Sequence, residues 1–215
     1  MAEVIIGYGF IVVILWAPTS QQRILSPIAL VGTLAVVLLG RSSCDRGGDD
    51  ARNHYPGAAE LGLGVRGLIP SLWILPAACG LTFAWVLVAK KIGTLHPLYK
   101  GELKHVVGYV LWTDYQQFLL QDLFMPRLMR LLSSEALAIT VAGILFATAH
   151  LPNLSLTVAT LVWGIVSCAL FLRYRNIYAL GLAQGLLGLG FAICVPDAWH
   201  HHLRVGLGYL RYPEN

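Results

Sequence analysis

The chain has 215 residues, of which 57% are hydrophobic and only 12% are charged, and its mean hydropathy is +0.68. An ordinary soluble domain carries about twice this share of charged residues, so the composition excludes that class and indicates an integral membrane protein. The formal net charge of +4 comes from basic residues scattered over short connections. That pattern is typical of membrane topology and argues against nucleic acid as a partner.

The apolar residues are grouped in long runs. Lipid offers no hydrogen-bond partners to the backbone, so a membrane chain must form helices or a closed barrel. The runs are continuous rather than alternating, which favours helices. They cover residues 4–16, 24–39, 68–89, 106–124, 135–151, 155–172 and 177–195. We therefore predict an all-α, polytopic transmembrane bundle of about seven helices.

The runs divide the chain into four parts. Residues 1–40 hold two runs that are short for a span of roughly 20 residues, and we expect an N-terminal membrane hairpin. Residues 41–67 combine charge with Gly and Ala and have no periodic apolar face, which predicts a flexible polar loop. Residues 68–195 form the expected membrane core. Residues 196–215 are amphipathic and carry Trp199, which predicts an interfacial tail.

Polar side chains interrupt the run at 106–124. Asp114, Gln117 and Gln121 recur at steps of three and four, which places them on one helix face. Gln116 and Asp122 lie about 100° to either side of that face. One interpretation is interhelical bonding, since amide side chains bridge membrane helices at about 0.6–2 kcal/mol each. The other is a functional site, because an intramembrane carboxylate needs a partner or a proton.

Two later runs also contain polar groups. His150 stands at the end of the run at 135–151, where a satisfied core or interface histidine and a functional one are both possible. Gln184 follows Gly181 along a face of small residues that also includes Gly185. Small residues at this spacing indicate close helix packing, which brings Gln184 within reach of a neighbouring helix.

Three consecutive histidines, His200, His201 and His202, follow the last run. Consecutive helical residues point about 100° apart, so one ion cannot bind all three, and a metal site would need ligands from elsewhere in the chain. An interfacial, partly protonated cluster is the favoured interpretation. We predict no cofactor and leave the metal ligands unassigned.

Three stretches carry a family resemblance: QQFLLQDLFMPRL at 116–128, FATAH at 146–150 and QGLLG at 184–188. Their order over about residues 100–195 resembles the CPBP group of intramembrane peptidases, which comprises CAAX proteases and bacteriocin-processing (Abi) proteins. Members of that family carry Glu-Glu-x-x-x-Arg, then Pro-Arg-Leu, then Phe-x-x-x-His, and finally His-x-x-x-Asn or Asp.

The polar centre departs from the family pattern. The substituted positions are Gln116 and Gln117 for the two glutamates, Gln121 for the arginine, Asp122 for the following glycine, Gln184 for the second histidine and Gly188 for the asparagine. Phe146, His150 and the Pro-Arg-Leu triplet agree. The resemblance implies a glutamate as general base, whereas a glutamine amide is not basic. A working enzyme would need another base, for which Asp114 and Asp122 are the candidates, with His150 as a partner.

The resemblance implies an intramembrane endopeptidase with a variant polar site, acting on a membrane-embedded or lipidated protein. The alternative is a catalytically dead relative that binds such a partner. A transporter is less favoured, because the chain shows no internal repeat. We expect the lipid bilayer as its surroundings and a multi-pass protein of a bacterial-type inner membrane.

Overall fold

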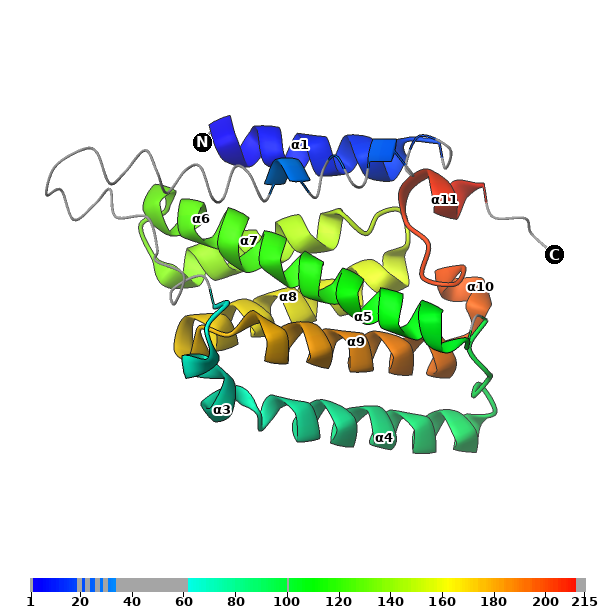
Figure 1. Cartoon of the computed structure of the whole chain (residues 1–215). Helices are drawn as coiled ribbons and strands as arrows, with labels where there is room; N and C mark the ends of the chain where they lie inside the picture. Colours follow the sequence, from blue (N-terminus) through cyan, green and yellow to red (C-terminus); the bar gives the residue numbers. More distant parts are fainter. Residues whose placement is uncertain are drawn as a thin grey trace, which may run out of the picture.

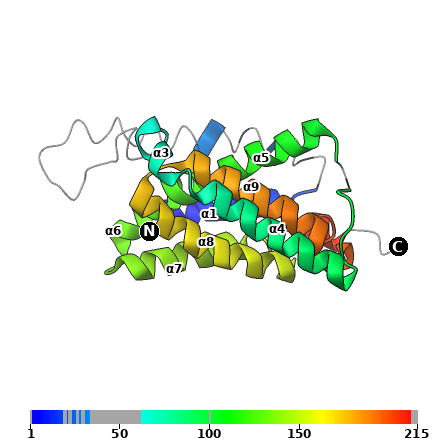
Figure 2. The same cartoon turned by 90° about the horizontal axis from the view of Figure 1, so that it is seen from below.

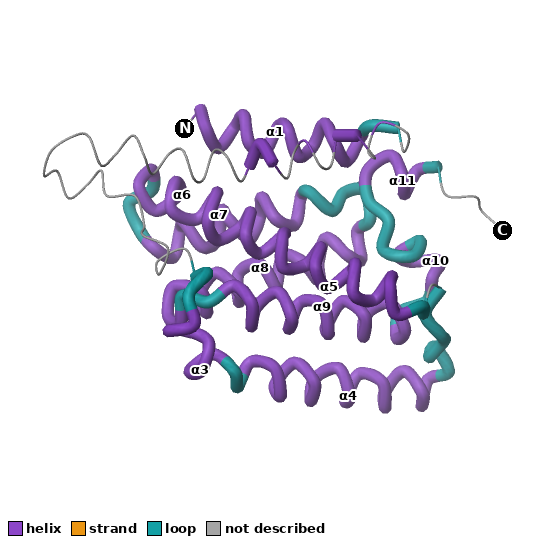
Figure 3. The backbone as a smooth tube through the Cα atoms, in the orientation of Figure 1, coloured by secondary structure: helices purple, strands orange, loops and turns teal. Residues whose placement is uncertain are grey.

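The computed structural model describes residues 2–18, 21, 24–25, 28, 31–33, 62–99 and 101–211 (Figure 1). Every regular element within this part of the chain is helical (Figure 3). Most of the run at 24–39 and most of the polar loop predicted at 41–67 lie outside the described residues, so the hairpin and the loop stay predictions.

The helices follow one another with short connections. Their bounds are α1 (Ala2–Trp16), η2 (Val65–Gly67), α3 (Leu68–Ser71), α4 (Ile74–Ile92), α5 (Leu103–Phe118), η3 (Leu119–Phe124), α6 (Met125–Leu131), α7 (Glu135–Thr148), α8 (Leu154–Tyr174), α9 (Ile177–Cys194), α10 (Asp197–His200) and α11 (Gly206–Leu210). In Figure 1 and Figure 2, α9 lies between α4 and α5, and α7 runs beside α8.

Three helical stretches in the described residues are long and apolar enough to cross a membrane: Leu68–Ile92, Leu154–Tyr174 and Ile177–Cys194. Their outer faces carry large apolar side chains such as Phe83, which is 64% exposed, and Val162, which is 61% exposed. Such faces are unfavourable in water and suited to lipid. The prediction of an all-α helical membrane bundle is confirmed.

The helix predicted at 106–124 continues to Leu131 through a π-helical stretch, η3. There the Met125 N–H bonds to the Leu120 carbonyl five residues back. The cause lies in Pro126, which has no N–H and whose ring clashes with the carbonyl four residues earlier, so the turn before it widens. The extra residue per turn rotates Gln121 and Asp122 relative to the face that a regular helix predicts.

Helices α5 and α9 touch through the small residues of α9. The Thr113 hydroxyl donates to the Gly181 carbonyl over 2.9 Å. A Cβ atom on Gly181 would lie 2.7 Å from the Cα of Asp114, and one on Gly185 would lie 3.2 Å from the Thr113 hydroxyl. The glycines therefore allow the backbones to approach closely, as the sequence predicted for this face.

Helices α7 and α8 pack in the same way. A Cβ atom on Gly164 would lie 3.1 Å from the Cα of Gly143. The turn that joins the two helices contains His150 and ends at Asn153, whose side chain caps α8 by accepting from the Leu156 N–H over 3.1 Å. The close packing and the cap together fix the position of His150.

Replacing Gly181 by alanine should separate α5 from α9, because the new methyl group meets backbone atoms of Asp114 that cannot rotate away. We expect a loss of about 1–3 kcal/mol in the free energy of unfolding, typical of overpacking. The measurement is unfolding in mixed micelles of a mild detergent and dodecyl sulfate. Gly108→Ala is the matched control, since a Cβ there meets nothing within 4 Å and alanine favours the helix by about 1 kcal/mol. Equal stability of the two variants would contradict the close packing.

Candidate functional site

Gln184 joins three helices through its side-chain amide. Its Oε1 atom accepts from Gln117 Nε2 of α5 over 2.6 Å and from Trp163 Nε1 of α8 over 3.1 Å. Its Nε2 atom donates to Gln116 Oε1 of α5. Gln184 is only 8% exposed, so these bonds replace water as its partners.

Trp163 determines which way the side-chain amides of this network are oriented. An indole N–H can only donate, so the atom of Gln184 that faces it must be the oxygen, and the Gln184 nitrogen must face Gln116. Gln116 consequently accepts through its oxygen and keeps its own NH₂ group for other partners. No described residue accepts a hydrogen bond from that NH₂ group, and Gln116 lines a cavity.

Gln117 and Gln121 form a second row behind Gln116. Gln121 Nε2 donates to Gln117 Oε1 over 3.1 Å and lies 3.4 Å from the Ser167 hydroxyl oxygen of α8. Both glutamines are fully buried, at 0% exposure, and neither lines the cavity. Their position supports and orients Gln184 rather than contacting a bound molecule.

His150 lines the same cavity, with 8% of its surface exposed. Its Nδ1 atom lies 2.7 Å from the Phe146 carbonyl oxygen. A carbonyl can only accept, so Nδ1 carries a proton, and in the neutral ring Nε2 then holds a lone pair. His150 therefore offers an acceptor, or a base, where Gln116 offers a donor.

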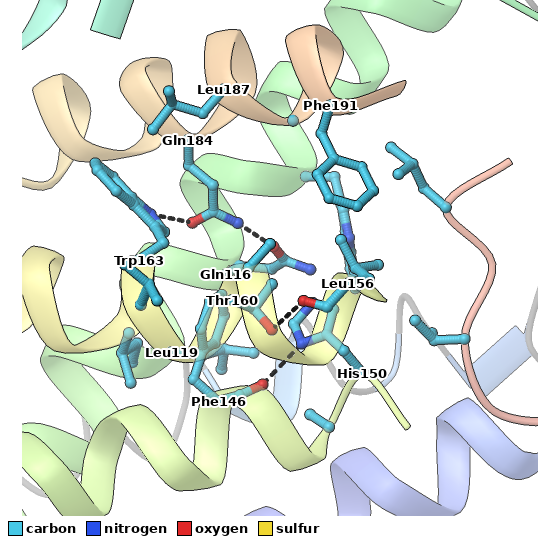
Figure 4. Close-up of a pocket in the computed structure, with 18 of the residues that line it drawn as sticks. Gln116, Leu119, Phe146, His150, Leu156, Thr160, Trp163, Gln184, Leu187 and Phe191 are labelled. Carbon is cyan, nitrogen blue, oxygen red and sulfur yellow. Dashed lines mark hydrogen bonds between the residues drawn. The ribbon is translucent and has the colours of Figure 1, made fainter. Parts of the chain in front are cut away.

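The cavity has a volume of about 560 Å³, within the range of small-molecule and peptide side-chain pockets. Most of its wall is apolar or aromatic, contributed by α1, α4, α5, α7, α8, α9 and the C-terminal tail. Figure 4 shows the bonded pair Gln116–Gln184 and the His150 ring in the lining of this one cavity. The site is thus an apolar pocket whose lining includes a few polar side chains.

The two carboxylates that were candidate bases do not line this cavity. Asp114 packs against Gly181 at the contact between α5 and α9, and its Oδ1 atom has no partner among the described residues. Asp122 is 3% exposed, and neither of its oxygens is hydrogen-bonded within the described part of the chain. Gln116, Gln184 and His150 line one cavity, and neither aspartate does.

Three contributors were not predicted from the sequence. Trp163 and Ser167 lie in a long apolar run, and the only signal available was their spacing of four residues, which places both on one face of α8. The tail residue Leu203 also lines the cavity, although nothing in its sequence context indicates that the tail folds back onto the bundle.

The tail histidines lie in three different surroundings. His200 is fully buried, and its Nε2 atom lies 2.9 Å from the Val195 carbonyl oxygen. His201 stacks on Tyr209, and His202 lies 2.9 Å from Asp197 Oδ1. Burial lowers the pKa of His200, which favours a neutral ring.

A fourth histidine, His96, comes from the connection after α4 and also contacts the Val195 carbonyl oxygen, over 2.9 Å. That bond raises the pKa of His96. His96, Asp197 and His200 form a group of possible metal ligands within the described residues.

The role of Trp163 can be tested with a double-mutant cycle. Trp163→Phe removes the indole donor, and we expect it to cost about 0.5–1.5 kcal/mol of unfolding free energy when Gln184 is present. In a Gln184→Leu background the indole N–H has already lost its partner, so the same substitution should cost clearly less. Unfolding in mixed micelles measures all four proteins. Equal costs in the two backgrounds would contradict the bond between Trp163 and Gln184.

Comparison with known proteins adds one finding. Residues 107–189 match the protein family described as type II CAAX prenyl endopeptidase Rce1-like. No curated protein and no solved structure gives a significant match. The matched segment contains Gln116, Gln184 and His150, and together with the three apolar helices it indicates an integral membrane protein. The resemblance to CAAX-type intramembrane peptidases that the motifs predicted is thereby confirmed over residues 107–189.

Proposed function

We propose that this chain is a multi-pass membrane peptidase of the CAAX type that hydrolyses a peptide bond of a membrane-embedded or lipidated protein. The observation that carries the proposal is that one apolar cavity is lined by two complementary side chains. His150 binds the Phe146 carbonyl through Nδ1, which leaves Nε2 as an acceptor, and Gln116 accepts through its oxygen, which leaves its NH₂ group as a donor. The match of residues 107–189 to the CAAX endopeptidase family supports the same reaction class. Placement in a bacterial-type inner membrane stays a prediction.

The apolar wall of the cavity suits a substrate delivered from the bilayer. Tyr8 and Ile11 of α1 and Trp85 of α4 contribute to it, next to the polar atoms. An apolar substrate segment would be transferred from lipid to a protein surface of similar polarity, so specificity must come from the few hydrogen-bonding groups. Those groups can bind a peptide carbonyl and a water molecule.

In the proposed reaction, His150 Nε2 takes a proton from water while the water oxygen attacks the substrate carbonyl carbon. The carbonyl oxygen, which gains negative charge, accepts a hydrogen bond from the Gln116 NH₂ group. His150 then gives the proton to the departing amine, and the products are a carboxylic acid and an amine. Gln184 and Trp163 position Gln116 and do not touch the reacting atoms.

A second function is favoured by one observation: none of the described residues that line the cavity is a carboxylate. The family mechanism uses a glutamate base, and a glutamine cannot replace it. A relative that only binds a membrane-embedded or lipidated protein would use the same pocket without the proton transfer.

Cleavage assays distinguish the two functions. We expect purified protein in detergent to cleave lipidated CAAX-type or transmembrane peptides, and His150→Ala to lower the rate by about 10²–10⁴-fold through loss of the general base. His105→Ala is the matched control, because His105 lies near the start of α5 and does not line the cavity. Product formation is followed by mass spectrometry.

Unchanged cleavage by His150→Ala would contradict the proposed base. An inactive wild-type protein that binds the same peptides, together with cleavage by Gln116→Glu, would favour the binding function, because the new carboxylate restores a glutamate of the family motif at a position that lines the cavity.

A further inference from the structure

We propose that His96, Asp197 and His200 bind a divalent cation of the zinc type at the end of α9. His96 comes from the connection between α4 and α5, whereas Asp197 and His200 belong to α10. One ligand atom from each of these residues lies within 4.8 Å of the others. Imidazole nitrogen and carboxylate oxygen are the donors that zinc and its neighbours in the first transition row prefer.

The distances in this group are close to those of a coordination shell. His96 Nε2 and His200 Nε2 each lie 2.9 Å from the Val195 carbonyl oxygen, and His200 Nε2 lies 3.5 Å from Asp197 Oδ1. Zinc binds such ligands at about 2.0–2.2 Å, so neighbouring ligand atoms are about 3.4 Å apart at tetrahedral angles. In the proposed site the Val195 carbonyl oxygen, to which both Nε2 atoms now donate, becomes a fourth ligand of the cation once those protons are released.

Neighbouring residues orient the proposed ligands. His202 Nδ1 lies 2.9 Å from Asp197 Oδ1, and the His202 ring stacks on Tyr99 at 3.8 Å between centroids. The His200 ring packs edge-on against the Phe191 ring of α9, with 5.6 Å between the ring centroids. Partners that hold ligand side chains in place are typical of metal sites.

Metal binding would also change the hydrogen bonding of the tail. In the structure the Leu203 N–H bonds to His200 Nδ1 over 3.2 Å, which requires a lone pair on Nδ1. Coordination through Nε2 moves the ring proton to Nδ1, so the bond from Leu203 is lost. Because Leu203 and Phe191 line the cavity, the cation would act on one wall of the candidate site as well as tie the tail to the connection after α4.

The alternative is that these histidines only hold the tail through hydrogen bonds, in which case no cation binds. The test uses full-length protein without a polyhistidine tag, purified in detergent and titrated with zinc chloride, followed by dialysis and elemental analysis. We expect one zinc per chain, and a higher thermal unfolding temperature in its presence, since a ligand that binds only the folded state stabilises it.

Two substitutions remove ligands while keeping side-chain size: His96→Gln and Asp197→Asn. Both positions are only partly buried, so the variants should fold, and each should weaken zinc binding at least tenfold. His201→Gln is the matched control, because His201 stacks on Tyr209 and is not one of the proposed ligands. Absence of zinc from the wild-type protein, or equal zinc affinity in His96→Gln and His201→Gln, would overturn the proposal. The test needs no enzymatic activity and is independent of the proposed function.

Discussion

The arrangement depends on one requirement: polar side chains inside a membrane must find their partners within the protein. Gln184 meets this requirement through bonds to Gln116, Gln117 and Trp163. These bonds are possible only because α5 and α9 approach closely at Gly181 and Gly185. A larger residue at either glycine would move the amides apart and leave them without partners in a medium that provides none. The close packing at the small residues of α9 therefore determines which hydrogen bonds Gln184 and its partners can form.

The cavity depends on a second close contact, between Gly143 of α7 and Gly164 of α8. It holds the turn that carries His150 next to the face of α8 that carries Trp163. The bond from His150 Nδ1 to the Phe146 carbonyl then fixes a ring proton on Nδ1. Two helix pairs, each packed through glycine, thus present a donor and an acceptor to one apolar space. The proposed peptidase function rests on this combination rather than on any single residue.

Much of this could be predicted from the sequence. The continuous apolar runs gave most of the described helices within a few residues. Helical spacing picked out Gln117 and Gln121, the face of small residues pointed to Gln184, and the end of an apolar run pointed to His150. What could not be predicted depends on contacts between distant segments. A regular helical period cannot anticipate the π-helical stretch before Pro126, which alters the direction of Asp122. Trp163 was not predicted as a site residue, because tryptophan is common in apolar runs. Its N–H becomes a hydrogen-bond donor of the site only because Gln184 lies beside it. The pairing of His96 with His200 joins residues about a hundred positions apart, which no local pattern reveals.

The central claim is that His150 presents an unprotonated Nε2 atom to the cavity, and its tautomer can be observed directly. Nitrogen NMR of protein labelled with ¹⁵N-histidine in detergent or lipid distinguishes protonated from unprotonated ring nitrogens, and the His150 signals are assigned by their loss in His150→Ala. The structure predicts a neutral ring with the proton on Nδ1, bonded to the Phe146 carbonyl. A proton on Nε2 would contradict the account, because His150 would then face the cavity as a donor and could not accept a proton from water.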